Sequence, residues 1–296
     1  MSDQHSSPQP SPESTSQPPL VWAAFDELRG RLAESPGLLF GTDFDGTLSP
    51  IADDPDTPEP TDPNLRSLRT FRDHPQVRPA VISGRRLADL RDRLGLSAVD
   101  CVGNHGLELG IDGSRETHPE AASAEPAVET VCHKLAGRLG DIEGTLIENK
   151  GVTATIHYRQ ADRTSVGEIE SRLREAVAEY GEGELEIHDG KESFELRPAA
   201  DWDKGSALSQ LREAVDESWM SFYIGDDTTD EAAFRAVGDD GITVHVGDNE
   251  QTAAAYRVRN STEAEVFIRW LATDGLAVLS ADGSLASTPT DEDAKM

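Results

Sequence analysis

Asp43-Phe44-Asp45-Gly46-Thr47 follows the apolar run Leu38-Leu39-Phe40, which predicts a buried β-strand that ends near two carboxylates. On an extended backbone, residues two apart share a face, so both aspartate side chains would point the same way. Like charges held this close repel each other. The pair therefore needs a cation between the carboxylates, a proton on one of them, or a solvated loop. Taken alone, the pair favours the solvated loop, so the rest of the chain has to decide.

The amino-acid composition is strongly acidic. The chain has 296 residues, enough for one large or two medium domains, and a formal net charge of −29 at pH 7. This charge disfavours nucleic acid and anionic membranes as partners, because bulk electrostatics repel them. Excess acid with few aromatic residues also suits a protein that works in concentrated salt, where screening shortens charge repulsion. We therefore expect a halophilic source.

Cysteine usage and hydropathy bear on the cellular compartment. The two cysteines, Cys101 and Cys132, form no Cys-x-x-Cys unit, so neither a zinc site nor a disulfide framework is expected. The sequence contains no apolar run long enough to cross a bilayer and no signal-peptide pattern at the N-terminus. These observations predict a cytoplasmic protein. Protein partners are not visible in the sequence, and a monomer is the working expectation.

The order of hydrophobic segments predicts an α/β fold with an inserted unit. Strand-like and helix-like segments alternate over residues 20–110 and again over 199–278, which favours a mostly parallel, Rossmann-like sheet covered on both faces. Between them, residues 111–198 show the pattern α-β-β twice, typical of a compact α+β domain. Residues 1–19 and 279–296 are small, polar and aperiodic, so we expect disordered tails.

Three polar clusters follow predicted strands of the larger unit. They are Asp43 with Asp45, then Ser83-Gly84-Arg85, and then Asp226, Asp227 and Asp230. In parallel sheets the ligand site lies beyond the carboxyl ends of the strands, so the three clusters should meet at one edge. Ser83 also precedes a predicted helix, whose N-terminal N–H groups favour an anion, although the residue is equally consistent with a simple N-cap.

So many carboxylates at one edge require a cation. Up to five of them would share the site with one nearby amine, that of Lys204. An oxygen-only ligand set favours a hard ion, with Mg²⁺ the first choice, bound by Asp43, Asp226 and the Asp45 carbonyl. Asp43 can then attack phosphorus, while Asp45 donates a proton to the leaving oxygen and later takes one from water. Ser83, Lys204 and Thr47 can hold the other phosphate oxygens.

Taken in order, the motifs resemble those of the haloacid dehalogenase superfamily of phosphatases. The four motifs are D-F-D-G-T-L from Asp43, V-I-S-G-R ending at Arg85, D-K-G from Asp203 and G-D-D-T-T-D-E from Gly225. A narrower resemblance, to the trehalose-6-phosphate phosphatases, is carried by three further segments. These are G-N-H-G-L-E from Gly103, E-N-K-G from Glu148 and G-K-E-S-F-E-L-R-P from Gly190. That family has an α/β cap inserted between the second and third motifs, as inferred here for residues 111–198.

The resemblance implies a role for each residue at a matching position. Asp43 would be the nucleophile and Asp45 the acid and base. Mg²⁺ would be held by Asp43, Asp45, Asp226, Asp227 and Asp230. The larger unit would contact phosphate or substrate through Thr47, Ser83, Gly84, Arg85, Asn104, His105, Gly106 and Lys204. The cap would hold sugar hydroxyls through Glu148, Lys150, Lys191 and Glu195, which without the resemblance are consistent with ordinary hairpin-edge charges.

Three functions stay open on this evidence. The resemblance implies hydrolysis of trehalose 6-phosphate to trehalose and phosphate, through an aspartyl-phosphate intermediate. Another member of the superfamily could act on a different sugar phosphate, such as sucrose phosphate or a glucosyl- or mannosyl-glycerate phosphate, and the cap residues would make the distinction. A catalytically silent sugar-phosphate-binding subunit is the third reading, and the complete set of motif carboxylates argues against it.

Overall fold

Strand β1 (Leu38–Thr42) lies in the middle of an eight-stranded sheet with the order β12-β11-β10-β1-β2-β3-β4-β5. The computed structural model describes residues 17–52, 57–181, 183–249 and 251–279. Strands β12 to β3 run parallel, and β4 and β5 are antiparallel additions at one edge. The other strands are β2 (Val77–Ile82), β3 (Asp100–Gly103), β4 (Glu108–Gly110), β5 (Glu116–Thr117), β10 (Met220–Gly225), β11 (Ile242–Val246) and β12 (Tyr256–Val258).

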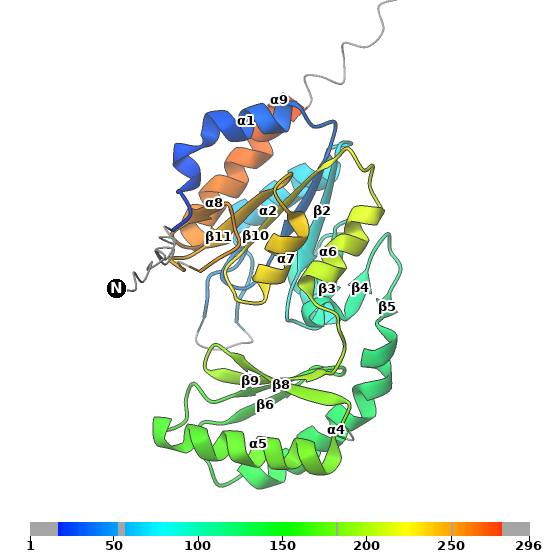
Figure 1. Cartoon of the computed structure of the whole chain (residues 1–296), viewed down its shortest axis with the longest axis vertical. Helices are drawn as coiled ribbons and strands as arrows, with labels where there is room; N and C mark the ends of the chain where they lie inside the picture. The colour runs from blue at the N-terminus through cyan, green and yellow to red at the C-terminus, as the bar shows by residue number, and fades with distance from the viewer. Residues whose placement is uncertain (1–16, 53–56, 182, 250, 280–296) are drawn as a thin grey trace, which may run out of the picture.

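Helices cover both faces of this sheet (Figure 1). One face carries α1 (Phe25–Ala33), α2 (Asp62–Asp73), α3 (Leu87–Leu94), α8 (Ser261–Trp270) and α9 (Leu276–Leu279). The opposite face carries α6 (Lys204–Glu213) and α7 (Asp230–Val237). Strand β1 is buried throughout, with Leu38 and Phe40 in the first apolar core and Leu39 in the second. This alternation is what a strand buried on both faces requires, and it explains the apolar run in the sequence.

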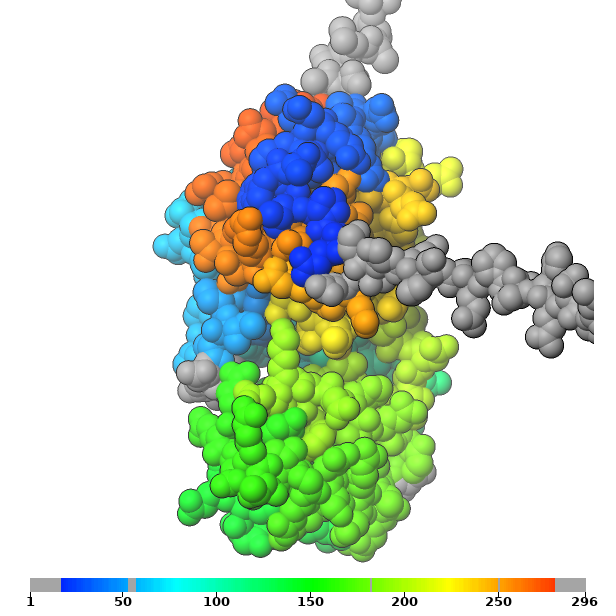
Figure 2. All heavy atoms as spheres, turned by 60° about the vertical axis from the view of Figure 1, so that its left-hand side comes forward, coloured from blue at the N-terminus to red at the C-terminus, as the bar shows by residue number. Residues whose placement is uncertain are grey.

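The inserted unit is a four-stranded antiparallel sheet with the order β6-β7-β9-β8 and two long helices on one face. The strands are β6 (Leu146–Asn149), β7 (Ala154–His157), β8 (Leu185–Gly190) and β9 (Ser193–Pro198), and the helices are α4 (Pro119–Leu139) and α5 (Val166–Tyr180). The open face of this sheet is turned toward the carboxyl ends of the parallel strands (Figure 1). In the space-filling view the two units remain distinct bodies packed against each other (Figure 2).

The predicted fold class, an α/β sheet with an inserted α+β unit, is confirmed. Strand β5 pairs with β4, so the larger sheet extends to residue 117, past the start of the insertion expected at residue 111. The short strands β4 and β5 were not predicted, because two- and three-residue strands carry too little periodicity to recognise. The predicted tails over 1–19 and 279–296 fall almost entirely outside the described residues. Within the described part of the chain, we find no helix with the length and apolar character to cross a membrane.

Candidate active site

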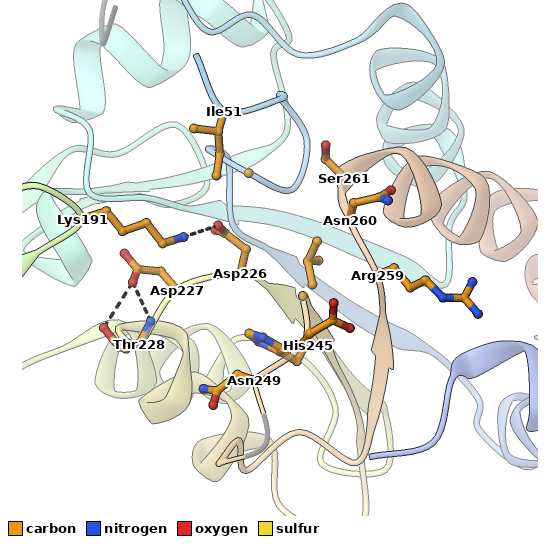
Figure 3. A pocket seen from close by; sticks show the side chains of 14 residues that line it. Ile51, Lys191, Asp226, Asp227, Thr228, His245, Asn249, Arg259, Asn260 and Ser261 are labelled. Atoms are coloured by element: carbon orange, nitrogen blue, oxygen red, sulfur yellow. Dashed lines mark hydrogen bonds and ion pairs between the residues drawn. The ribbon is translucent and has the colours of Figure 1, made fainter. Parts of the chain in front are cut away.

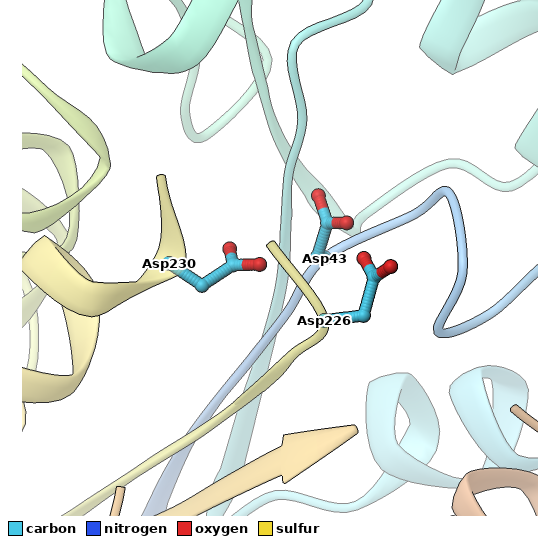
Figure 4. A group of neighbouring side chains, drawn as sticks. All are labelled: Asp43, Asp226 and Asp230. Atoms are coloured by element: carbon cyan, nitrogen blue, oxygen red, sulfur yellow. The ribbon is translucent and has the colours of Figure 1, made fainter. Parts of the chain in front are cut away.

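Three carboxylates converge beyond the ends of β1 and β10 (Figure 4). Asp43 follows β1, Asp226 follows β10, and Asp230 begins α7. One oxygen of each carboxylate lies within 4.8 Å of the others. Asp43 is 4% exposed and Asp230 is fully buried, so water does little to screen their repulsion. The chain crosses from one side of β1 to the other at this point, which is where parallel sheets usually bind ligands.

Lys204 neutralises part of this charge. Asp203 caps α6 by accepting a hydrogen bond from the backbone N–H of Ser206, and this sets Lys204 on the first turn of the helix. The Lys204 ammonium donates to Asp43 Oδ1 at 2.8 Å and to Asp230 Oδ1 at 2.7 Å. Burial works to lower the pKa of Lys204, but the charges of Asp230 and Asp43 outweigh burial and raise the pKa above its ordinary value. The amine therefore remains a cation.

Asp226 is approached by a lysine of the inserted unit and by a glycine of the loop after β1. Lys191, in the turn between β8 and β9, donates to Asp226 Oδ2 at 2.7 Å (Figure 3). Gly46 has a φ of +77°, and a Cβ there would lie 2.3 Å from the same oxygen. Only glycine lets the loop pass this close. Burial raises the pKa of Asp226 to about 6 even with Lys191 beside it.

The cluster has the chemistry of a hard-cation site. All its donors are carboxylate oxygens, which Mg²⁺ prefers. Burial raises the pKa of Asp43 well above its ordinary value, and the charges of Asp230 and Asp226 add to this although Lys204 opposes them. The pKa values of Asp43 and Asp226 stay raised although lysines lie beside both residues, so the lysine charges do not fully compensate these carboxylates. A divalent ion beside Asp43 and Asp226 would supply the missing charge.

The Asp45 carboxylate is held by Arg85. The guanidinium donates to Asp45 through Nε at 2.8 Å and through Nη2 at 2.7 Å, a bidentate pair. Arg85 also donates to Asp89 at 3.1 Å and lies 5.3 Å from the centre of the Phe44 ring. Asp45 therefore does not offer a side-chain oxygen to the Asp43–Asp226–Asp230 cluster. Its backbone carbonyl is the atom that the sequence analysis expects to contact a metal.

The hydroxyls of Ser83 and Thr47, both predicted to bind phosphate, lie in different surroundings. Ser83 follows β2, is 1% exposed and accepts a hydrogen bond from the Arg85 backbone N–H at 3.2 Å. It lines the same cavity as Asp43. Thr47 is fully buried, does not line that cavity, and its hydroxyl has no hydrogen-bond partner among the described residues. Of the two predicted phosphate-binding hydroxyls, therefore, Ser83 lies at the cavity and Thr47 does not.

Asn104, His105 and Gly106 form a tight turn in which all three residues have positive φ. Asn104 is fully buried and lies outside the cavity lining. Its amide donates to the Lys150 carbonyl at 3.3 Å and accepts from the Thr153 hydroxyl at 2.7 Å. Asn104 thus joins the larger unit to the inserted one, and only His105 of this turn lines the cavity.

The inserted unit presents its charged groups to the larger one. Lys150 donates from Nζ to the Gly84 carbonyl at 3.1 Å. Glu195 Oε2 lies 3.2 Å from His105 Nε2. Glu148 Oε2 lies 2.9 Å from His157 Nε2. Burial works to raise the pKa of Glu195, but its contacts with His105 and Arg197 outweigh burial and hold the pKa well below the ordinary value. Glu195 is therefore a carboxylate at neutral pH.

The register of the smaller sheet explains why these side chains share a face. Glu148, Thr155 and Glu195 are partners across β6, β7 and β9, and Leu146, His157 and Ser193 form a second row. All six side chains line the cavity. Alternation along each strand sends the intervening residues, such as Ile147, Ile156 and Phe194, into the core beneath α4 and α5.

A cavity of about 660 Å³ lies between the two units. It is lined at one end by Asp43, Ser83, Lys204 and Asp226 and elsewhere by the polar face of the smaller sheet. Four residues predicted from sequence for the site do not line it, namely Thr47, Asn104, Gly106 and Asp230. A second hollow of about 500 Å³ adjoins Asp226 and extends to the N-terminus of α8 (Figure 3).

Sequence reasoning missed several polar residues at the site, among them Tyr223, His157 and Arg197. Tyr223 is fully buried on β10 and donates to Asp230 at 2.8 Å. His157 and Arg197 contact the predicted sugar-binding carboxylates Glu148 and Glu195. Strand alternation places His157 on the face of Glu148 and could have identified it, whereas Tyr223 gave no signal because aromatic residues in central strands are usually core.

Comparisons with known proteins agree with this geometry. The family described as trehalose-phosphatase matches residues 41–262. A trehalose-phosphate phosphatase of Mycobacterium marinum is 38% identical over 253 residues, which are 82% of this chain and 63% of that protein. The C-terminal domain of trehalose-6-phosphate phosphatase from C. albicans superposes with a TM-score of 0.72 at 25% identity, covering 88% of this chain and 99% of that one. A trehalose-6-phosphate phosphatase related protein shares the fold, with a TM-score of 0.72 at 24% identity over 81% and 99% of the two chains.

The parallel sheet with its inserted α+β unit is the fold of these solved structures. With three quarters of its length matched, the chain belongs to the trehalose-phosphatase family. It spans about 63% of the length of the M. marinum relative.

The buried state of His105 predicts a pH-dependent stability. Burial lowers its pKa from 6.5 to about 4, more than Glu195 can restore, and its Nδ1 has no partner among the described residues. The unfolded chain therefore binds more protons than the folded protein between pH 4 and 6.5. The free energy of unfolding should fall by up to about 3 kcal/mol as the pH drops through this window.

We expect His105→Asn to flatten this dependence, measured as the urea midpoint at pH 4.5 and at pH 7. His188→Asn provides the control, because His188 lies exposed on β8 of the inserted unit. Parallel pH profiles for wild type and His105→Asn would show that His105 is not held neutral by burial.

Proposed function

We propose that the chain hydrolyses trehalose 6-phosphate to trehalose and inorganic phosphate, the last step of trehalose synthesis. One observation carries the proposal. The Asp43–Lys204 pair and the charged face of the inserted sheet line a single cavity. A phosphate bound at the aspartate end would leave its sugar against Glu148, Lys150 and Glu195. Carboxylates and amines at fixed positions suit the many hydroxyl groups of a disaccharide.

Asp43 acts as the nucleophile. Its carboxylate oxygen attacks phosphorus, the bond from phosphorus to the sugar oxygen breaks, and an aspartyl-phosphate forms. Lys204, 2.8 Å from Asp43, orients the carboxylate and is placed to hold an oxygen of the transferred phosphoryl group. The Ser83 hydroxyl and the backbone of Gly84 and Arg85, which follow it in the chain, offer further donors at the same end of the cavity.

Asp45 supplies and recovers the proton. In its protonated form it gives a proton to the departing sugar oxygen, and as the carboxylate it then takes one from the water that attacks the aspartyl-phosphate. The resting carboxylate is paired with Arg85 at 2.7 and 2.8 Å. Because Arg85 donates to both carboxylate oxygens, Asp45 has to leave this pair to act as the acid.

Asp43 and Asp226, together with the backbone oxygen of Asp45, would hold Mg²⁺. The ion supplies charge neutralisation for the phosphate and the aspartates when it is bound. Asp230 belongs to the same carboxylate cluster, and its oxygens also accept from Lys204, Tyr223 and the Asp227 backbone N–H. Asp227 accepts from the Thr228 backbone N–H at 2.6 Å and shapes the loop.

The sugar assignment predicts a selective defect in Glu195→Gln. The substitution keeps the size of the side chain but removes the charge that accepts from sugar hydroxyls. We expect kcat/KM for trehalose 6-phosphate to fall by about 10- to 100-fold, the value of one or two hydrogen bonds to a charged group. Turnover of p-nitrophenyl phosphate, which has no sugar, should stay within about twofold.

Glu186→Gln is the matched control, because Glu186 is exposed on β8 and does not line the cavity. It should leave both substrates unaffected. If Glu195→Gln lost activity equally on both substrates, Glu195 would not be a sugar-binding residue.

The direct test of phosphatase activity is release of phosphate from trehalose 6-phosphate and from p-nitrophenyl phosphate with Mg²⁺. We expect turnover of both, with the sugar phosphate strongly preferred. Release from neither would contradict the proposal and favour a silent sugar-phosphate-binding subunit. Release from the aryl phosphate alone would retain the chemistry of Asp43 and assign the cavity to another sugar phosphate.

We further propose the setting in which the chain works. The net charge of −29 favours concentrated salt, so unfolding midpoints should rise from dilute to molar salt. We expect a cytoplasmic, monomeric phosphatase with segments 20–110 and 199–278 as its core and residues 111–198 as its cap, although the pairing of β5 with β4 assigns residues up to 117 to the core. Closure of this cap over a bound sugar would exclude water from the aspartyl-phosphate.

A further inference from the structure

Tyr223 is a fully buried tyrosine on the central strand β10. Its ring packs edge-on against Phe234, with the ring centres 5.8 Å apart. Its register partner on β1 is Gly41, where a Cβ would lie 2.7 Å from the Tyr223 ring. The ring can therefore occupy this position only because β1 carries glycine there, and the close fit fixes the direction of the hydroxyl.

The Tyr223 hydroxyl donates to Asp230 Oδ1 at 2.8 Å. A carboxylate has only acceptor oxygens, so the tyrosine hydroxyl is the donor of this pair. Tyr223 does not line the cavity, so any effect on the reaction has to pass through Asp230.

Asp230 and Asp43 compete for one ammonium group. Lys204 donates to Asp230 Oδ1 at 2.7 Å and to Asp43 Oδ1 at 2.8 Å. The other Asp230 oxygen accepts from the Asp227 backbone N–H at 2.9 Å. Tyr223 and Lys204 thus share one acceptor oxygen. Each donor added to a carboxylate reduces the charge left to attract the others.

We propose that Tyr223 is a positioning residue for phosphoryl transfer. Its hydroxyl holds the Asp230 carboxylate in place and takes up part of its charge. Lys204 then remains beside Asp43 and free to meet the phosphate, instead of being drawn wholly to Asp230. The inference rests on the proposed phosphatase chemistry at Asp43, and it is independent of which sugar phosphate is the substrate.

The test uses Tyr223→Phe, which keeps the ring and removes only the hydroxyl. Tyr256→Phe is the matched control, because the Tyr256 hydroxyl donates to a carboxylate, Glu27, at 2.7 Å away from the cavity. With p-nitrophenyl phosphate and Mg²⁺, we expect kcat to fall about tenfold in Tyr223→Phe while KM changes less than threefold. Tyr256→Phe should match wild type in both constants.

A double-substitution cycle separates positioning from mere packing. If the hydroxyl acts through Asp230, Tyr223→Phe should cost nothing further in an Asp230→Asn background. Additive losses, or a wild-type kcat in Tyr223→Phe, would overturn the proposal while leaving the phosphatase function intact.

Binding of beryllium fluoride, a mimic of a phosphoryl group on a carboxylate, provides a readout without turnover. Measured by fluorine NMR with Mg²⁺, its dissociation constant should rise about tenfold in Tyr223→Phe and stay unchanged in Tyr256→Phe. Equal constants in Tyr223→Phe and wild type would contradict the proposal. If the wild-type protein neither turned over p-nitrophenyl phosphate nor bound beryllium fluoride, both the proposed function and this inference would be overturned.

Discussion

Asp43→Asn should reduce phosphate release by at least about 10⁴-fold, the loss expected when a covalent nucleophile is removed. An amide has no anionic oxygen to attack phosphorus, and no aspartyl-phosphate can form. Asn keeps the size of the side chain and can still accept from Lys204, which lies 2.8 Å from Asp43. The variant should therefore fold and still bind trehalose 6-phosphate, as isothermal titration calorimetry would measure.

Asp92→Asn is the control for this variant, because Asp92 is exposed on α3, outside the cavity lining. It should turn over at the wild-type rate. A wild-type rate in Asp43→Asn would mean that another group attacks phosphorus. Loss of substrate binding together with turnover would make Asp43 a binding residue.

Lys204→Met should impair both folding and catalysis. The ammonium is 2% exposed and balances two buried carboxylates, Asp43 and Asp230. Removing one partner of a buried charge group leaves the others uncompensated, which costs about 3–5 kcal/mol in the free energy of unfolding. Turnover should fall by about 10³-fold, because a charge aimed at the transferred phosphoryl group is lost.

Lys204→Arg separates the two effects. It retains the charge, so the urea midpoint should recover most of the loss, measured for both variants at low salt. Turnover should stay low, since a planar guanidinium cannot reproduce the two contacts of a compact ammonium at 2.7 and 2.8 Å. An unchanged midpoint and rate in Lys204→Met would refute a structural and catalytic role for the amine.

The parallel sheet explains why much of the site was predictable. Asp43, Ser83 and Asp226 each follow an apolar strand, and parallel strands bring their carboxyl ends to one edge. Lys204 was expected near Asp43 and the phosphate, from its place at a predicted helix start and in the D-K-G motif. The sequence could not show that Lys204 bridges Asp43 and Asp230, because that depends on side-chain directions in the folded protein.

Contacts between distant segments account for what the sequence did not reveal. The family resemblance implies a substrate contact for Asn104, whereas in the structure its amide joins the two units through Lys150 and Thr153. Tyr223 depends on the absence of a side chain at Gly41, a register contact between two strands far apart in the chain. Lys191 lies in a hairpin turn and meets Asp226 only when the units are packed together.

The most direct measurement of the central claim is phosphate release from a panel of sugar phosphates with Mg²⁺, at low and at molar salt. The panel comprises trehalose 6-phosphate, sucrose 6-phosphate, glucose 6-phosphate and glucosyl-3-phosphoglycerate. We predict that kcat/KM for trehalose 6-phosphate exceeds that of every other substrate by about 100-fold or more, as hydroxyl recognition by buried polar groups allows. A flat profile, or a higher value for another sugar phosphate, would contradict the assignment of the cavity to trehalose 6-phosphate.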